Sequence, residues 1–259
     1  MNCRITHIGT ATMLLEIGNI RLLTDPVFDP PGGDYHFGYG TSSKKLTPPA
    51  MKPEDIGKVD AVILSHDHHE DNLDVAGRAF LSNARQVLTT IAGAKRLGGH
   101  AIGLKSWQST SIKSDSFDLK VTAVPARHGS LGSHLIVGET TGFVMEWPGQ
   151  KYGALYISGD SVWFNGITEI TKHFRIGTAI VHIGKAGFPI TGPVWFTFSA
   201  REAIKVVEAL KPHTVIPIHY EGWKHFREPR AQAEKEFLRA GIQDKVQWLP
   251  LGKRVELEI

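Results

Sequence analysis

The stretch that decides the fold is residues 59–74, VDAVILSHDHHEDNLD. Its first six residues are mostly aliphatic or β-branched and are bounded by polar ones, a pattern typical of a buried strand. Three histidines, His66, His68 and His69, follow where this strand ends and the chain turns. Because functional side chains gather where strands end, we expect a site here.

The polar half of this stretch has the residue types of a metal site. Imidazoles two and three positions apart on a tight loop can converge on one cation, and Asp71 can add an oxygen ligand to the same ion or to a neighbouring one. The alternative is a polar turn in which Asp71 or Asn72 is the N-cap of a helix that begins near Leu73. We predict metal ligation, with capping as an additional role.

Length and composition are those of an ordinary globular protein. The 259 residues are 41% hydrophobic and 21% charged, which allows one large core. We recognise no apolar run of membrane-spanning length and no export signal. The single cysteine, Cys3, excludes an internal disulfide. We therefore expect a cytoplasmic protein without integral membrane segments.

The charge of the chain does not favour a nucleic-acid partner. The formal net charge is +3, and the Lys and Arg residues are scattered along the sequence instead of forming one basic run. We expect a small-molecule partner and no nucleic acid, and a homo-oligomer is compatible with the sequence.

The chain opens with three short predicted strands, at 4–7, 12–17 and 20–24, separated by turn residues. The next segment, 26–53, is rich in Gly, Pro, Tyr and Phe. A loop of this length inside a domain is usually functional or disordered. Its aromatic residues favour a lid that faces the substrate over a disordered segment.

Beyond the histidine cluster, mixed helix and strand patterns flank a section of strands only. Helices are predicted at 73–82, 91–97, 167–174, 200–210 and 231–240, and strands at 86–89, 101–104, 110–113, 117–124, 135–138, 143–147, 155–158, 179–183, 215–218, 246–249 and 254–259. This order suits two packed sheets covered by helices on their outer faces. With no linker and no short repeat, we predict a single domain over 1–259.

Three further predicted strands lead to a residue that can bind metal: His128, Asp160 and His219. Taken singly, these could be a turn residue, a helix cap and a core histidine. Their recurrence at strand ends, together with the first cluster, indicates the nitrogen and oxygen ligands of a two-metal centre.

The order of these ligands resembles the metallo-β-lactamase superfamily of binuclear metallohydrolases. The family has a run H-x-H-x-D-H, then a His after a strand, an Asp usually within a Gly-Asp pair, and a final His after another strand. The segments 6–12 (THIGTAT) and 22–26 (LLTDP) look like the branch of ascorbate-6-phosphate lactonase-like proteins and N-acyl-phosphatidylethanolamine phospholipase D. The resemblance spans essentially the whole chain. It implies an α+β fold, a four-layer αββα sandwich of two mixed sheets flanked by helices, with the metals at the edge that the sheets share.

The first motif departs from the family pattern by a one-residue insertion. When the family motif is aligned from its first residue, His66, its second histidine falls on His68. When it is aligned from its last residues, that histidine falls on His69, and Asn72 replaces the final histidine of the motif. In either register the second metal lacks a histidine. We predict a tight first site and a looser second one. The first is made by His66, His68 or His69, His128 and Asp160, and the second by Asp71, Asp160 and His219. The expected cofactor is zinc, one or two ions per chain, with manganese or iron an option at the oxygen-richer second site.

This ligand set predicts a hydrolase that uses a metal-bound hydroxide to cleave an ester, lactone or phosphoester. Asp71 would orient the hydroxide and shuttle its proton. His182, which follows another strand, is either a general acid or substrate contact, or a hydrogen-bonded core histidine. His7 is expected to brace the site without binding metal.

Two alternative functions stay open at this stage. A phosphodiesterase acting on a lipid or nucleotide would need a basic groove beside the metals, whereas an apolar aromatic mouth would favour esters and lactones. Phe188, Phe196 and His225 are among the residues expected to form such a mouth. The second alternative is a catalytically impaired member that binds only a metal or a ligand.

Overall fold

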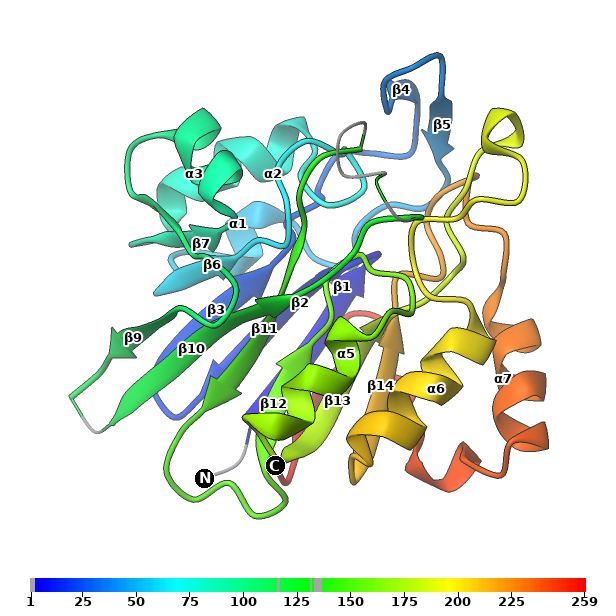
Figure 1. Cartoon of the computed structure of the whole chain (residues 1–259). Coiled ribbons are helices and arrows are strands. Elements are labelled where there is room, and N and C mark those ends of the chain that lie inside the picture. Colours follow the sequence, from blue (N-terminus) through cyan, green and yellow to red (C-terminus); the bar gives the residue numbers. More distant parts are fainter. Residues whose placement is uncertain (1–2, 116, 131, 133–136) are drawn as a thin grey trace.

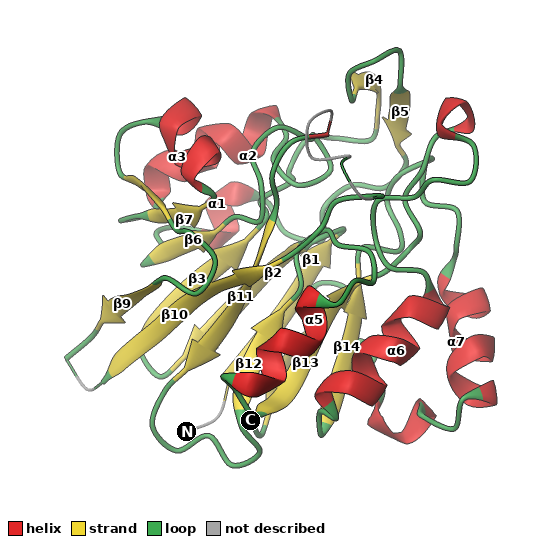
Figure 2. Ribbon diagram, viewed as in Figure 1, coloured by secondary structure: helices red, strands yellow, loops and turns green. Residues whose placement is uncertain are grey.

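Two mixed sheets face each other in the middle of the molecule (Figures 1 and 2). The computed structural model describes residues 3–115, 117–130, 132 and 137–259. Within these residues the first sheet has the strand order β15-β1-β2-β3-β6-β7-β8 and the second has the order β14-β13-β12-β11-β10-β9. The strands of the first sheet are β1 (Cys3–Gly9), β2 (Thr12–Ile17), β3 (Ile20–Thr24), β6 (Ala61–Ile63), β7 (Val87–Thr89), β8 (Ala101–Gly103) and β15 (Arg254–Leu257). Those of the second are β9 (Ser109–Lys113), β10 (Asp118–Pro125), β11 (Thr141–Glu146), β12 (Ala154–Ile157), β13 (Ile176–His182) and β14 (Thr214–Ile218).

The two-residue period of the strands builds the core between the sheets. Met13 and Leu15 of β2 and Leu119, Val121 and Ala123 of β10 belong to one buried apolar cluster that both sheets share. The intervening residues point to the outer faces, because successive side chains of a strand alternate between the two sides of a sheet.

Helices cover the outer face of each sheet (Figure 1). The first sheet carries α1 (Pro53–Ile56), α2 (Val75–Phe80) and α3 (Ile91–Leu97), and the second carries α5 (Gly166–Glu169), α6 (Ala200–Leu210) and α7 (Arg230–Arg239). Each set packs on its sheet through an apolar cluster of its own. Short 3₁₀ helices cover Leu81–Asn83, Ile170–Lys172, Pro189–Thr191 and Gln243–Lys245. The layers are those of the predicted αββα sandwich, and the predicted fold class is confirmed.

Helix α6 shows how directly local sequence sets an element. Ser199 is its N-cap and accepts a hydrogen bond from the Glu202 backbone N–H, while the Glu202 side chain accepts one from the Ser199 backbone N–H. Ala203, Val206, Val207 and Leu210 recur at helical spacing and are all buried on the sheet. The helix therefore has the bounds that the sequence predicts.

The predicted strand at 246–249 is wrong. Val246 makes one isolated bridge to Val215 of β14, and the Gln247 N–H donates to the Val215 carbonyl oxygen. Pro217 faces the same edge of β14 as Val215, since it lies two residues further on, and proline has no N–H to continue the ladder. The predicted strand at 135–138 falls largely outside the described residues.

The segment 26–53 is more regular than predicted. It contains a hairpin of β4 (Gly32–His36) and β5 (Ser42–Lys45), seen at the top of Figure 1. The hairpin is tied down by the buried Lys45, whose Nζ lies 3.2 Å from Asp74 Oδ2. The Leu46 N–H also donates to the Gly222 carbonyl oxygen at 2.7 Å.

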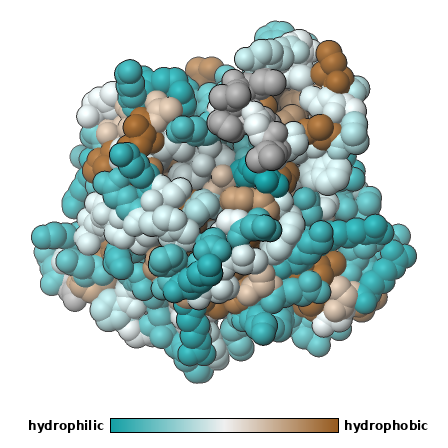
Figure 3. All heavy atoms as spheres, in the orientation of Figure 1, coloured by the Kyte–Doolittle hydropathy of each residue, from teal (hydrophilic) through white to brown (hydrophobic). Residues whose placement is uncertain are grey.

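Apolar side chains reach the viewed surface only in small separate patches among hydrophilic residues (Figure 3). The large exposed apolar residues, such as Leu46, Val75 and Leu238, are distributed over different elements. Most of the hydrophobic residues therefore serve the three buried clusters.

Truncation of an inter-sheet side chain should destabilise the protein far more than the same truncation at the surface. We expect Leu15→Ala to lower the free energy of unfolding by about 2–5 kcal/mol, because a fully buried leucine leaves a cavity. Leu238→Ala is the matched control, since Leu238 is 64% exposed, and should change it by about 0.5 kcal/mol or less. Urea unfolding of both variants checks this, and equal effects would contradict the proposed core.

Candidate metal centre

The strands that lead to the predicted ligands, β6, β10, β12 and β14, end at the same edge of the sandwich (Figure 1). His66 follows β6, His128 follows β10, Asp160 follows β12 and His219 follows β14. The turn before Asp160 requires Gly159, which has φ +59°: a Cβ there would lie 2.4 Å from the Thr141 carbonyl oxygen. Tight turns thus bring side chains from both sheets together.

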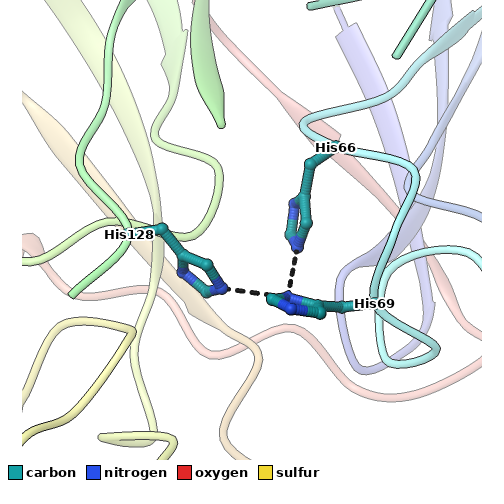
Figure 4. Close-up of side chains that lie close together, drawn as sticks. All are labelled: His66, His69 and His128. Carbon is teal, nitrogen blue, oxygen red and sulfur yellow. Dashed lines mark hydrogen bonds between the residues drawn. The ribbon is translucent and has the colours of Figure 1, made fainter. Parts of the chain in front are cut away.

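Three histidines form the first cluster (Figure 4). His69 Nδ1 lies 3.1 Å from His66 Nε2 and 3.0 Å from His128 Nε2. Burial, followed by the neighbouring histidines, holds the pKa of His66 and His69 well below the usual value, and burial lowers that of His128. The three rings are therefore neutral near pH 7 and can offer lone pairs.

The close contacts of the first cluster fit a metal ion. One ring nitrogen can carry only one hydrogen, so His69 Nδ1 cannot donate to both of its neighbours. The His66 and His128 rings carry their hydrogens on Nδ1, from which they donate to Ser65 Oγ and to the Phe196 carbonyl oxygen, so both present Nε2 lone pairs to His69 Nδ1. At least one of the two contacts then lacks a hydrogen, unless a cation lies between the nitrogens. Three imidazole nitrogens are a donor set that zinc favours.

The second cluster consists of Asp71, Asp160 and His219. Their ligand atoms lie within 4.8 Å of one another, and His219 Nε2 is 3.5 Å from Asp71 Oδ2 and from Asp160 Oδ1. Although burial raises the pKa of each carboxyl, hydrogen bonds from histidines and their charge hold it well below the usual value. Two ionised carboxylates with one imidazole form an oxygen-rich donor set that fits a divalent cation.

Hydrogen bonds behind the clusters fix which ring nitrogen faces inward. The His128 Nδ1–H donates to the Phe196 carbonyl oxygen at 3.0 Å, which leaves Nε2 as the lone-pair atom. His66 Nδ1 lies 2.9 Å from Ser65 Oγ, and that hydroxyl donates to Asp25 Oδ1 at 2.8 Å. Burial raises the pKa of Asp25 to about 8.

The structure separates His68 from His69. His69 belongs to the first cluster, whereas the His68 Nε2–H donates to the Val137 carbonyl oxygen away from it. Among the described residues the register is thus His66-x-x-His69, with the insertion between the two. The helix cap is neither Asp71 nor Asn72: Asp74 caps α2 and accepts a hydrogen bond from the Gly77 N–H, so the predicted cap is wrong.

Asn72 stands where the family pattern has a histidine. In the amide orientation that satisfies its partners, its nitrogen donates to Asp71 Oδ1 and Asp160 Oδ2, both at 3.2 Å. The amide therefore links the two carboxylates of the second cluster instead of offering them another nitrogen ligand.

His182 and His7 lie behind the clusters. His182 is fully buried, and its Nδ1–H donates to Asp160 Oδ1 at 2.9 Å. It is absent from the described lining of the cavity, so this position suits orientation of Asp160 better than contact with a substrate. The His7 Nε2–H donates to the Thr10 carbonyl oxygen, which also accepts the His219 backbone N–H.

A cavity of about 440 Å³ opens over both clusters. Its lining includes ligands from each cluster, His69, His128, Asp71 and Asp160, together with an apolar wall formed by Phe37, Ala186, Phe188, Val194 and Phe196. The described lining residues include no Lys or Arg. Lys185, which follows β13, instead has its Nζ 4.6 Å from the centre of the Trp195 ring.

Two contributions to this cavity were only partly visible in the sequence. Phe37 reaches it from the hairpin segment and packs on His69, Phe188 and His225, with ring centroids 4.9 to 5.8 Å apart. His225 was expected only as a wall residue, yet its Nε2 lies 3.1 Å from Asp71 Oδ2. His225 lies six residues after His219, and this spacing does not match a ligand motif that would have predicted the contact with Asp71.

An αββα sandwich with histidine and aspartate clusters at its shared strand edge is the arrangement of a metal-dependent enzyme. Residues 20–220 match the family model described as the beta-lactamase superfamily domain, so the chain belongs to that family. It is a metal-dependent hydrolase of the metallo-β-lactamase superfamily.

Similar proteins cover the whole chain. A UPF0173 metal-dependent hydrolase of Pyrococcus abyssi is 28% identical over 99% of this chain and 99% of its own length, and one of Pyrococcus furiosus is 28% identical over 98% and 99%. In fold, the chain is similar to an isothiocyanate hydrolase from Delia radicum gut bacteria, with a TM-score of 0.82, 21% identity, and coverage of 99% and 100%. The diiron β-hydroxylase CmlA of Streptomyces venezuelae shares the fold with a TM-score of 0.70 at 16% identity, over 99% of this chain and 54% of CmlA.

None of the helices in the described part of the chain is long and apolar enough to cross a membrane.

The two adjacent histidines should behave differently when each is replaced. We expect His69→Ala to reduce the metal bound per chain after dialysis by about one equivalent, because it removes one of three converging nitrogens. His68→Ala is the matched control and should keep the parent content. Elemental analysis of both variants checks this. Loss of metal in His68→Ala but not in His69→Ala would mean that His68 is the ligand.

The metal-free protein should lose stability as the pH falls. Burial lowers the pKa of His7, His66, His69, His128 and His182, so between about pH 6.5 and 5.5 these rings take up more protons in the unfolded chain than in the folded one. Asp25, whose pKa burial raises to about 8, and His219, whose pKa, despite burial, the charges of Asp160 and Asp71 raise to about 9, act in the opposite direction but are fewer. We expect the free energy of unfolding in chelator to drop by about 2–4 kcal/mol over this interval.

Urea unfolding at several pH values, with and without chelator, checks this. A stability that is flat or rises towards pH 5.5 would contradict the neutral state assigned to these rings.

Proposed function

We propose that this hydrolase cleaves the ester or lactone bond of an uncharged, largely apolar small molecule. The supporting observation is the cavity over the two clusters, whose described lining is aromatic and aliphatic apart from the candidate ligands, Ser130, the threonines Thr41 and Thr191, and His225. A substrate bound there would lose its contacts with water, and the described lining offers no cationic side chain in their place. Such a pocket favours neutral molecules, because an unpaired charge is costly to desolvate.

We further propose zinc at the cluster of His66, His69 and His128, and a weaker second site at Asp71, Asp160 and His219 that suits zinc, manganese or iron. A divalent cation held by these residues would lower the pKa of a bound water towards 7 and polarise the scissile carbonyl group. The first cluster has three nitrogen donors, whereas the second has one nitrogen and the carboxylate oxygens. The softer donor set should bind zinc more tightly than the harder one.

The side chains of the site have separate tasks in this proposal. Asp71 lines the cavity and is ionised, so its carboxylate can orient water and accept a proton. Asp160 belongs to the second cluster, interacts electrostatically with His66 and His128 of the first, and is held by the His182 ring. Phe37, Phe188 and Phe196 would bind the apolar part of the substrate and exclude bulk water from it.

A phosphodiesterase is the weaker alternative. It would need cationic side chains near the site to hold the phosphate, but Arg127 and Lys185, which are next to the lining residues His128 and Ala186 in the sequence, have other partners. Arg127 donates from Nη2 to the Trp163 carbonyl oxygen and lies over the Phe164 ring, and Lys185 lies over Trp195. Neither residue belongs to the described lining of the cavity.

An isothiocyanate is a second candidate substrate that the same cavity would accept. Its central carbon is an electrophile, and the molecule is neutral and usually apolar, as the lining requires. The fold neighbour that is named an isothiocyanate hydrolase makes this chemistry worth testing alongside esters.

The proposal predicts a clear preference among generic substrates. We expect kcat/KM for p-nitrophenyl butyrate to exceed that for bis(p-nitrophenyl) phosphate by about 100-fold or more, because burying an unpaired anion costs several kcal/mol. Activity should disappear with chelator, return with added zinc or manganese, and be lost in Asp160→Ala. Phenethyl isothiocyanate completes the panel.

Faster cleavage of the phosphodiester would overturn the substrate class, and the phosphodiesterase alternative would take its place. If only the isothiocyanate is hydrolysed, the proposal of a neutral, apolar substrate stands, but the ester or lactone is no longer the proposed bond.

A further inference from the structure

His225 makes polar contacts at both ring nitrogens in the wall of the cavity. Its Nε2 lies 3.1 Å from Asp71 Oδ2, and its Nδ1 lies 2.7 Å from Ser43 Oγ. The ring stacks on Phe188 at 5.0 Å with an interplanar angle of 11°, and Phe37 packs against it at 4.9 Å. The residue is only 7% exposed, so water does not compete freely for these contacts.

The partners determine the direction of this hydrogen-bond chain. An ionised carboxylate can only accept, so Nε2 carries the hydrogen and donates it to Asp71. In the neutral ring Nδ1 is then an acceptor, and the Ser43 hydroxyl donates to it. The chain runs from Ser43 through His225 to Asp71 and fixes both the tautomer and the ring orientation.

This chain joins the candidate metal site to the hairpin. Ser43 belongs to β5, and Lys45 of the same strand pairs with Trp223, two residues before His225. The Lys224 N–H donates to the Lys44 carbonyl oxygen at 3.0 Å. The strand that carries Ser43 and the segment that carries His225 are therefore held together by backbone contacts.

Asp71 needs such support because Asn72 supplies no ring to the second cluster. The Asn72 amide holds Asp71 Oδ1, while Oδ2 is the atom that faces both His225 and His219. His219 Nε2 is itself a candidate metal ligand, so without the His225 contact only the Asn72 amide would be left to orient the carboxylate around a bound cation.

We propose that His225 is a positioning residue for the second metal site: with Ser43 as its own support, it holds the Asp71 carboxylate in the orientation that binds the cation. The inference rests on the proposed second site but not on the proposed substrate. A ring present only for packing would need neither nitrogen, and phenylalanine would then serve as well among these aromatic neighbours.

The test is zinc binding to the metal-free protein, measured by isothermal titration calorimetry and by the metal retained per chain after dialysis. In His225→Phe, which keeps a ring but loses both nitrogens, we expect the weaker binding event to lose about 10–100-fold in affinity, with the tighter event unchanged. His225→Gln places an amide nitrogen near the former Nε2 and should restore the affinity to within a few-fold of the parent. Ser43→Ala should weaken the same event several-fold.

His173→Phe, at an exposed histidine outside the site, is the control and should bind as the parent does. Equal losses at both events in His225→Phe, no loss, or a parent that binds a single zinc would each overturn the proposal. Should His225→Phe fail to fold, as judged by thermal unfolding without metal, the comparison of His225→Gln and Ser43→Ala with the parent decides it. Because calorimetry needs no substrate, a failed ester assay leaves this result unaffected.

Discussion

The structure depends on burying two carboxylates and four imidazoles together at one edge of two sheets. Ionised Asp71 and Asp160 are almost fully buried among histidines. Removing such groups from water costs several kcal/mol each unless an opposite charge or a full set of hydrogen bonds compensates. The donors His182, His225 and Asn72 provide part of this compensation, and divalent cations would provide the rest. The tight turns and the close approach of strand ends follow from this need.

The same constraint shapes the surroundings of the site. The side chains that hydrogen-bond to the candidate ligands come from both sheets and from the hairpin segment. The site therefore forms only when the two sheets and the hairpin are all in place. Phe37 and Ser43 arrive from the segment before α1, whereas Phe188 and Phe196 arrive from the loop after β13. Four of the candidate ligands, His69, Asp71, His128 and Asp160, share the lining of the cavity with these aromatic rings. The family therefore accounts for the ligands, while the loops of this chain account for its preference among substrates.

Much of the architecture could be predicted because its signals are local. The period of two in β2 and β10, the capping pair Ser199 and Glu202, and the apolar spacing of α6 each act over a few residues. The strand at 246–249 failed because its outcome depends on a neighbour 29 residues away: Pro217 lacks the N–H that a longer ladder on that edge would need. The hairpin in the segment 26–53 is likewise held by distant contacts, to Asp74 and Gly222, that no local pattern reveals.

The sequence by itself determined the αββα layers and the order in which His66, Asp71, His128, Asp160 and His219 follow their strands. Periodicity and strand ends are properties of the chain, and so they can be read along it. Only the tertiary structure decided between His68 and His69, assigned the Asn72 amide to two carboxylates, and brought His225 to Asp71. Each of these outcomes depends on distances between residues that the fold brings together and that their spacing along the chain does not reveal. The exact position of an inserted residue and a contact across 154 positions leave no periodic trace, and three-dimensional geometry alone resolves them.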